Sequence, residues 1–270
     1  MPDFIFDVPL KTLAIWCSVI AICAMVFGLL IVKPLFRLLI GTGPDFNNSV
    51  NHATSTFSLF YGLLLGLLTV AAYQNSEHVR ESINNEATSL AGLYAQMGAY
   101  PEPTRSDVKW LMRDYTLFTI HKEFPAHRKG EVLNGGFNRA DAIRRSLSQF
   151  EPGSDGQRIN HQQAMSAFQE FATERQKRLT GVTTEIPDVL WYAVLVGAVI
   201  NILLLVLLKM RQLAHFVLGT ITASFLGVIL FVIVTLDRPL RGEAGLAPVA
   251  YQLVWDRLMV WDEPLVQRGE

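Results

Sequence analysis

Four stretches of about 20 apolar residues, each free of charged side chains, constrain this chain more than any other feature. A helix needs about 20 such residues to cross a bilayer core of about 30 Å. Backbone groups in lipid have no water to bond, so a spanning segment must satisfy its own N–H and C=O groups as a helix. The sequence therefore predicts four transmembrane helices, at Thr12–Val32, Ala53–Tyr73, Val189–Leu208 and Phe216–Leu236.

The overall composition agrees with a membrane protein. Charged residues make up 17% of the 270 residues, against about 25% in a typical soluble domain, and the deficit is confined to the four stretches. The net charge of −1 gives no reason to expect a nucleic-acid partner. Cys17 and Cys23 lie on different faces of the first predicted helix, so we expect no disulfide between them.

Catalytic and metal-binding motifs are missing from the sequence. It contains no G-x-S-x-G, P-loop or H-E-x-x-H motif, and its histidines show no metal-ligand spacing. Asp114 and Glu123 come closest to an acid pair, but their helix has average polarity, which favours a structural role. We therefore expect neither an enzyme nor a bound cofactor or metal.

A polar segment at 74–187 separates the second and third predicted spans and reads as a helical extramembrane domain. No helix breaker follows the second span, so we expect it to continue as one helix to about Ala99. The fold class is thus all-α, with spans at 1–73 and 188–236, the extramembrane domain at 74–187 and a C-terminal segment at 237–270.

The extramembrane segment is expected to contain three further helices. Thr104 and Asp107 resemble a capping box at the start of the first, which Pro125 is expected to end. A loop at 126–137 should precede a short helix capped by Asn138 and Asp141 and ending near Gln149. The last is expected at about 157–180, with Ile159, Ala164, Phe168, Phe171 and Leu179 facing inward.

Pro248 favours the first turn of a C-terminal helix, with Leu253, Val254, Leu258 and Trp261 on its apolar side. Tyr and Trp are enriched at membrane interfaces, so this helix could lie at the headgroup level or pack on the extramembrane domain. Four spans place both termini and that domain on one side of the membrane. Basic residues flank the spans on both sides, so the positive-inside rule leaves the orientation open.

Small and weakly polar residues recur at helical spacing along the second span and its extension. This small-residue stripe consists of Ser55, Ser58, Gly62, Gly66, Thr69, Tyr73 and Glu77. Bulky apolar residues occupy the opposite side, as on a helix that lines a pore. Gly62 and Gly66 also form a G-x-x-x-G motif, which is common where membrane helices pack closely. The sequence leaves both the pore and the packing interpretations open.

Four other polar residues lie in or beside the apolar segments. Asn201, in the middle of the third span, should find a hydrogen-bond partner on another helix. Glu81 has basic neighbours in the sequence and favours a surface ion pair. Glu86 lies near an apolar line and should seek an arginine or backbone donors. Asp237 directly follows the fourth span, where a structural or an ion-contacting role is open.

Several motifs in order along the chain resemble the bestrophin-like family of bacterial membrane proteins. They cover roughly residues 10 to 260 and comprise Y-G-L-L-L-G-L-L-T-V-A-A-Y at 61–73, E-A-x-S-L-x-x-L-Y at 86–94, Y-P-E-P at 100–103, L-M-R-D-Y at 111–115, I-P-D-V-L-W at 186–191, L-D-R-P-L-R-G at 236–242 and P-V-A-Y-Q-L-V at 248–254.

The resemblance implies an oligomeric ion channel of the bacterial plasma membrane. Bestrophins proper are homopentamers whose second span lines the pore and whose helical domain is cytosolic, so the resemblance favours the pore interpretation and a cytoplasmic domain. Its partners would be the lipid bilayer, ions and further copies of the chain. A non-conducting membrane-anchored structural or regulatory protein is the alternative.

Two departures from bestrophins proper limit what can be transferred. The segment after the fourth span, L-D-R-P-L-R-G-E-A-G, mixes arginines with its acids, so calcium gating of the animal type is not expected. The stripe holds small residues where bestrophins have a bulky apolar neck. In a ring of copies, Glu77 would form a circle of carboxylates that favours cations, whereas a pair with Arg80 would leave the anion selectivity of bestrophins proper as the alternative.

Overall fold

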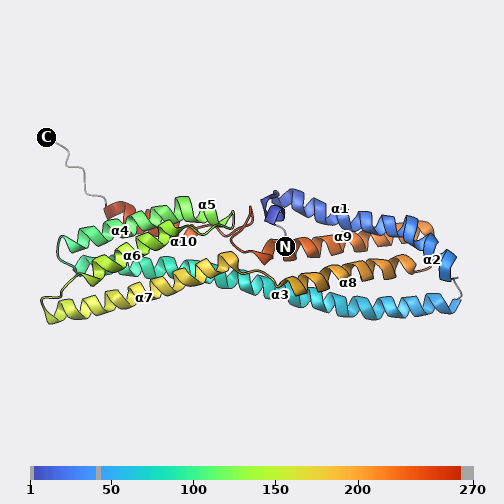
Figure 1. Ribbon diagram of the computed structural model, residues 1–270, viewed down its shortest axis with the longest axis horizontal. Helices are drawn as coiled ribbons and strands as arrows, with labels where there is room; N and C mark the ends of the chain where they lie inside the picture. Colours follow the sequence, from blue (N-terminus) through green and yellow to red (C-terminus); the bar gives the residue numbers. More distant parts are fainter. Residues whose placement is uncertain (1–2, 41–43, 263–270) are drawn as a thin grey trace. The chain divides into compact units, whose positions relative to one another are not determined.

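The computed structural model describes residues 3–40 and 44–262, which are helical over most of their length. The chain folds into two contact units (Figure 1). We call residues 1–76 and 185–237 the transmembrane unit, and residues 77–184 and 238–270 the helical unit. In chain order the elements are η1 (Asp3–Asp7), α1 (Leu10–Phe27), η2 (Gly28–Val32), α2 (Lys33–Ile40), α3 (Pro44–Gln96), η3 (Met97–Ala99), α4 (Thr104–Phe118), η4 (Thr119–Glu123), α5 (Phe124–His127), α6 (Asn134–Ser148), α7 (Asp155–Thr183), α8 (Asp188–Leu207), α9 (Gln212–Asp237), α10 (Val249–Val254), η5 (Trp255–Met259) and η6 (Val260–Asp262).

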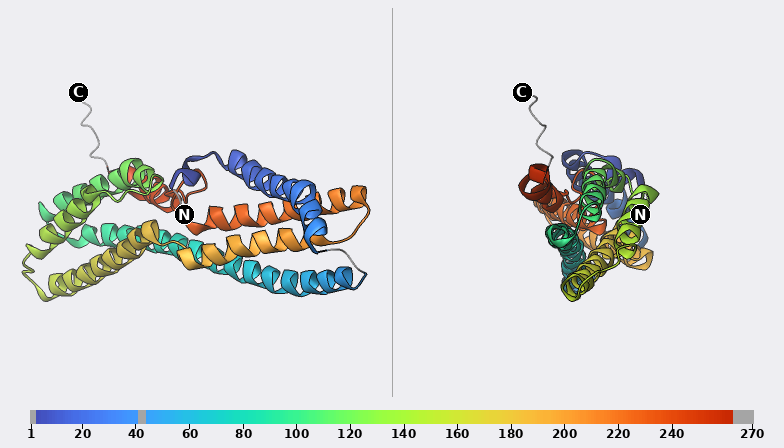
Figure 2. Two further views of the ribbon diagram at one scale, coloured as in Figure 1. Left: turned by 45° about the vertical axis from the view of Figure 1, so that its right-hand side comes forward. Right: turned by 90° about the vertical axis from the view of Figure 1, so that its left-hand side faces the viewer.

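The transmembrane unit is a bundle of α1, α8, α9 and the first part of α3, which lie alongside one another in all views (Figures 1 and 2). Within the described residues, four helices are long and apolar enough to cross a membrane, and each matches one predicted span, the third to within one residue. The predicted all-α fold with four spans is therefore confirmed. The first span is less regular than expected, because a π-helical turn at η2 joins α1 to α2.

Glycines let the helices of this bundle approach one another closely. A Cβ at Gly197 of α8 would lie 2.4 Å from the ring of Tyr61, and one at Gly227 of α9 would lie 2.6 Å from the backbone of Ser18. Small residues at such contacts are typical of membrane helices, which associate through tight packing rather than through a hydrophobic effect.

Helix α3 is a continuous helix of 53 residues that contributes to both units. At 1.5 Å per residue it is about 80 Å long, well beyond the thickness of a hydrocarbon core. The predicted continuation of the second span to about Ala99 is confirmed, because α3 runs to Gln96 and η3 ends at Ala99.

The helical unit differs from the sequence prediction around Pro125. The proline does not end the preceding helix: α4 passes through the π-helical turn η4 into α5, which extends to His127. Pro125 lies in the first turn of α5, where its missing N–H is tolerated. The predicted capping box is also wrong, because α4 has Pro103 at its N-cap and no side-chain cap.

Helix α6 begins at Asn134, earlier than predicted, with Leu133 at its N-cap. Asn138 and Asp141 therefore lie inside the helix and do not cap it, and Asp141 instead pairs with Arg144 at 2.7 Å. In α7, Phe168 and Phe171 are buried as predicted, whereas Ile159 is exposed.

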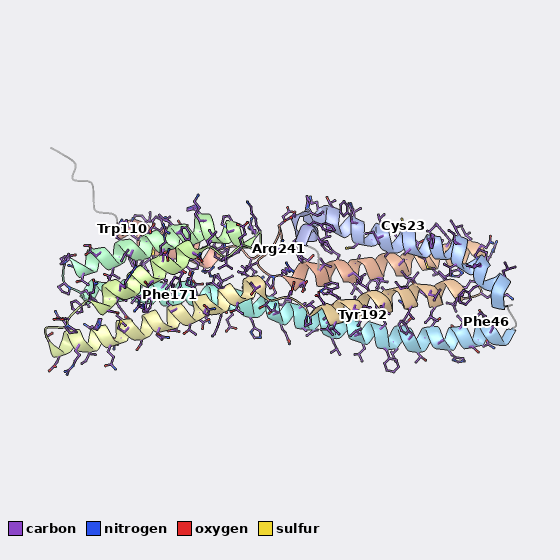
Figure 3. The ribbon with its side chains drawn as sticks, in the orientation of Figure 1. Cys23, Phe46, Trp110, Phe171, Tyr192 and Arg241 are labelled. Atoms are coloured by element: carbon purple, nitrogen blue, oxygen red, sulfur yellow. The ribbon has the colours of Figure 1, made fainter. Side chains whose placement is uncertain are left out.

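The C-terminal helix packs within the helical unit. Tyr251 and Met259 are buried in its core, whereas Trp261 is 79% exposed. Of the predicted apolar side, Val254 and Leu258 pack against this core, whereas Leu253 and Trp261 are exposed. Of the two positions that the sequence left open for this helix, the structure shows packing on the extramembrane domain. Phe171 of α7, labelled in Figure 3, belongs to the same core.

Candidate functional site

The small-residue stripe of α3 is largely uncovered within the chain. Ser55, Gly62, Gly66 and Tyr73 are exposed, and a Cβ added at Gly62 or Gly66 would meet no atom of the described residues within 4 Å. The G-x-x-x-G motif therefore mediates no helix contact within the described part of this subunit. Most contacts to the neighbouring helices come instead from another side of α3, where the buried residues include Val50, Thr54, Tyr61, Leu65, Leu68 and Ala72. Ser58, at the edge of the stripe, is half-buried and also reaches α8.

Among the described residues, hydrogen bonds from Ser58 and Tyr61 join α3 to α8 in the transmembrane unit. Ser58 donates to the side-chain oxygen of Asn201 at 2.9 Å, and Tyr61 donates to the backbone oxygen of Val194 at 2.9 Å. Asn201 thus has the interhelical partner expected of a buried amide. Of the other stripe hydroxyls, that of Thr69 donates to the carbonyl of Leu65 on its own helix.

The acidic residues past the second span differ in their surroundings. Glu77 forms an ion pair with Arg80 at 3.2 Å, and both side chains are about half exposed. Glu81 is exposed. Glu86, by contrast, is completely buried on the packed side of α3.

Glu86 belongs to a buried ion-pair cluster, which we define as Glu86 of α3, Glu123 of η4, His127 of α5, and Arg175 and Arg178 of α7. Arg178 donates to Glu86 at 2.5 and 3.1 Å and to Glu123 at 2.9 Å. Its third nitrogen lies 2.6 Å from Nε2 of His127, while Arg175 donates to Glu123 at 3.2 Å. The arginine partner expected for Glu86 is therefore Arg178.

The charges of this cluster balance when His127 is neutral. Burial opposes ionisation of Glu123, but the positive charges of Arg178 and Arg175 outweigh it and hold the pKa of that carboxyl below its ordinary value. Burial and the positive charge of Arg178 lower the pKa of His127. Neutral His127 can accept from Arg178 through Nε2 while its other ring nitrogen donates to the carbonyl of Glu131 at 3.0 Å.

Aromatic residues enclose the cluster. The hydroxyl of Tyr115 donates to Glu86 at 2.7 Å, and the ring of Phe124 lies under the guanidinium of Arg178, with 5.4 Å between guanidinium carbon and ring centroid. Burial and the nearby Glu86 carboxylate raise the pKa values of Tyr115 and of Tyr251 from α10. Through these bonds the cluster and Tyr115 tie α3 to α4, α5 and α7. The C-terminal helix joins them through the ring of Tyr251, which packs against Tyr115 and Phe124.

Sequence reasoning missed Arg178 and His127 as members of this cluster. A signal was present, because Phe171, Arg178 and Val182 share one face of α7 at spacings of seven and four. An arginine on an apolar line implies a buried acidic partner. Asp114 and Glu123, for which the sequence favours a structural role over an acid pair, each pair with an arginine: Asp114 with Arg139 at 2.8 Å and Glu123 with Arg178 at 2.9 Å.

Asp237 ends α9 in the transmembrane unit and is almost completely buried. Its carboxylate accepts from the backbone N–H of Ile186 at 2.6 Å, just before α8. Among the residues that the structure describes, no group of three histidine, cysteine or acidic side chains is arranged to hold a metal ion.

We compared the chain with known protein sequences and solved structures. No curated protein sequence matches the chain. A crystal structure of a bacterial Bestrophin homolog from Klebsiella pneumoniae is similar with a TM-score of 0.67 and 12% identity, covering 93% of this chain and 99% of the other. A second crystal structure, described only as that of a membrane protein variant, has a TM-score of 0.70 and 10% identity, covering 90% and 97%. At such identities the likeness shows a shared fold.

The family is shown by the sequence itself. The pattern of the Bestrophin-like domain matches residues 19–251, which is most of the chain and includes α3, the buried ion-pair cluster, the last three spans and part of the first. This four-span helical membrane protein therefore belongs to the Bestrophin-like family.

Proposed function

We propose that this chain assembles into an oligomeric ion channel whose path is lined by the small-residue stripe of α3. The observation that carries the proposal is the open space at Gly62 and Gly66, which no described residue of the same chain fills. Tight packing elsewhere in the bundle uses other glycines, such as Gly197 and Gly227. The stripe is therefore available to face either water or another copy of the chain.

Several copies are needed because one subunit has too few inward polar positions to enclose a water path, and the stripe glycines Gly62 and Gly66 face away from its other spans. Copies related by rotation about one axis can place their α3 stripes around a shared path. The likeness to bestrophin homologues supports such a ring, and we propose five copies in the plasma membrane of a bacterium. The helical unit and both termini would share the cytoplasmic side.

The proposed path can be tested by cysteine accessibility, because the chain has only two cysteines to remove. In a variant with Cys17→Ser and Cys23→Ser, we expect Gly66→Cys to react with a charged, membrane-impermeant thiol reagent and to change ion flux in proteoliposomes. Ile221→Cys on α9 is the control, since Ile221 is 61% exposed on another span. Flux that is equally sensitive at both positions, or at neither, would rule out a path along the stripe.

Ion selectivity is proposed to depend on the Glu77–Arg80 pair at the end of the second span. A ring of Glu77 carboxylates favours cations, whereas the paired Arg80 offsets part of that charge. In asymmetric salt, Glu77→Gln should shift the reversal potential toward anion permeation and Arg80→Gln toward cation permeation. Unchanged reversal potentials in both variants would show that the pair does not face the path. Any anion selectivity would then be independent of Glu77.

A non-conducting membrane-anchored structural protein is the rival proposal. A monomer in both mild detergent and lipid nanodiscs would favour it, as would a stable oligomer without ion flux.

Reporter fusions at residues 130 and 212 should report opposite sides of the membrane, with residue 130 in the cytoplasm.

A further inference from the structure

A cavity lies in the transmembrane unit at the end that carries the α8–α9 turn. Its volume is about 700 Å³, and Leu30, Met210 and Phe216 are among its apolar lining residues. Lys33, Gln212 and His215 provide its polar side. The volume falls within the range of about 300–1,000 Å³ typical of sites for small ligands.

Lys33 brings a positive charge to the cavity wall where the apolar part of the first span ends. Its ammonium group donates to the carbonyl of Leu208 at 2.9 Å and lies 2.5 Å from Nδ1 of His215. The second ring nitrogen of His215 lies 2.9 Å from the carbonyl of Leu205. These bonds hold Lys33 at the polar edge of an otherwise apolar cavity, with His215 accepting as the neutral ring.

The sequence around the cavity is strongly basic. The segments 33–52 and 208–215 contain four basic side chains but only one acidic residue, Asp45, and no acidic residue lines the cavity among the described residues. The basic residues are Lys33, Arg37, Lys209 and Arg211. Basic pockets between membrane helices, at the level of the lipid headgroups, are suited to anionic lipids.

We propose that this cavity binds an anionic glycerophospholipid, with an acyl chain on the apolar lining and the headgroup phosphate beside Lys33. An acyl chain accounts for the apolar wall, and the phosphate matches the charge at its edge. Neither feature depends on ion conduction, so the site would exist whether or not the protein is a channel.

The test measures lipid binding to the purified full-length protein in detergent by native mass spectrometry. The probes are dioleoyl phosphatidylglycerol, dioleoyl phosphatidylcholine and inorganic phosphate. We expect phosphatidylglycerol to bind about fivefold or more tightly than phosphatidylcholine, since one basic side chain contributes about that factor at an anionic headgroup. Competition by inorganic phosphate alone at similar concentration would overturn the lipid assignment.

Substitutions at the cavity separate the headgroup from the acyl chain. Lys33→Gln should lower the ratio of the affinities for phosphatidylglycerol and phosphatidylcholine toward one, while Lys33→Arg should retain the parental ratio. Lys11→Gln is the matched control, because exposed Lys11 flanks the other end of the first span. Met210→Trp should place a bulky ring in part of the cavity and weaken the binding of both lipids at least threefold.

Three results would each overturn the proposal. They are equal binding of the two lipids by the unmodified protein, an undiminished preference in folded Lys33→Gln, and parental affinity for both lipids in folded Met210→Trp. Should Lys33→Gln not fold because Lys33 also bonds the end of α8, Lys33→Arg and Met210→Trp still decide the question.

Discussion

Replacing Arg178 with methionine is the strongest single test of the buried ion-pair cluster. Arg178 is completely buried and bonds Glu86, Glu123 and His127. Without it, Glu123 still pairs with Arg175, whereas Glu86 loses its cationic partner and keeps the hydrogen bond from the hydroxyl of Tyr115. Glu86 then becomes an uncompensated buried carboxylate. Removing one partner of a buried ion pair costs about 3–5 kcal/mol, so we expect a loss of that size in the stability of the helical unit.

Hydrogen exchange of the full-length protein in nanodiscs measures this loss locally. Since about 1.4 kcal/mol corresponds to a factor of ten, slowly exchanging amides of α7 should exchange roughly 10²- to 10⁴-fold faster in Arg178→Met. Arg144→Gln is the control, because its ion pair with Asp141 lies at the surface, with the arginine side chain 53% exposed, and should contribute under about 1 kcal/mol.

A double variant distinguishes charge imbalance from lost packing. Arg178→Met combined with Glu86→Gln leaves only the balanced Glu123–Arg175 pair. The stability losses of the two single variants should therefore not add, and the double variant should lose about 1–3 kcal/mol less than their sum. The reasoning is refuted if the losses are additive, or if Arg178→Met alone accelerates exchange no more than Arg144→Gln does.

Three further predictions concern Gly136, His127 and Asn201. Gly136→Ala should destabilise the helical unit by more than about 2 kcal/mol in hydrogen exchange, because its Cβ would overlap the carboxylate of Glu123; Gly156→Ala, which meets no atom of the described residues, should be neutral or stabilising. Folding lowers the pKa of His127, so the contribution of this group to stability should be complete above about pH 6.5. Below that pH the stability should fall by at most about 1.4 kcal/mol per pH unit. His127→Gln should remove this part of the pH dependence, and an unchanged pH profile would contradict the prediction. Asn201→Leu should cost only about 0.6 kcal/mol in denaturation by detergent, as expected for one interhelical hydrogen bond, and a loss above about 2 kcal/mol would indicate a further role for the amide.

The sequence alone determined the features that depend on local physics. Lipid imposes its demand on each segment separately, so length and absence of charge were enough to identify the four spans. The continuity of α3 followed in the same way from the absence of a breaker after the second span. The predicted helix end at Pro125 was wrong. Proline disrupts a helix interior but is tolerated after the π-helical turn η4, and no sequence pattern indicated that turn.

Only the tertiary structure decided which polar groups meet. Arg178 is 92 residues from Glu86 and 55 from Glu123 along the chain, so no local spacing could pair them. The G-x-x-x-G motif of α3 allowed packing or exposure, and the choice depended on which side of α3 meets α8, where Tyr61 packs on Gly197. Such pairings depend on the positions of whole helices, whereas a span or a helix break depends on residues that are neighbours in the sequence.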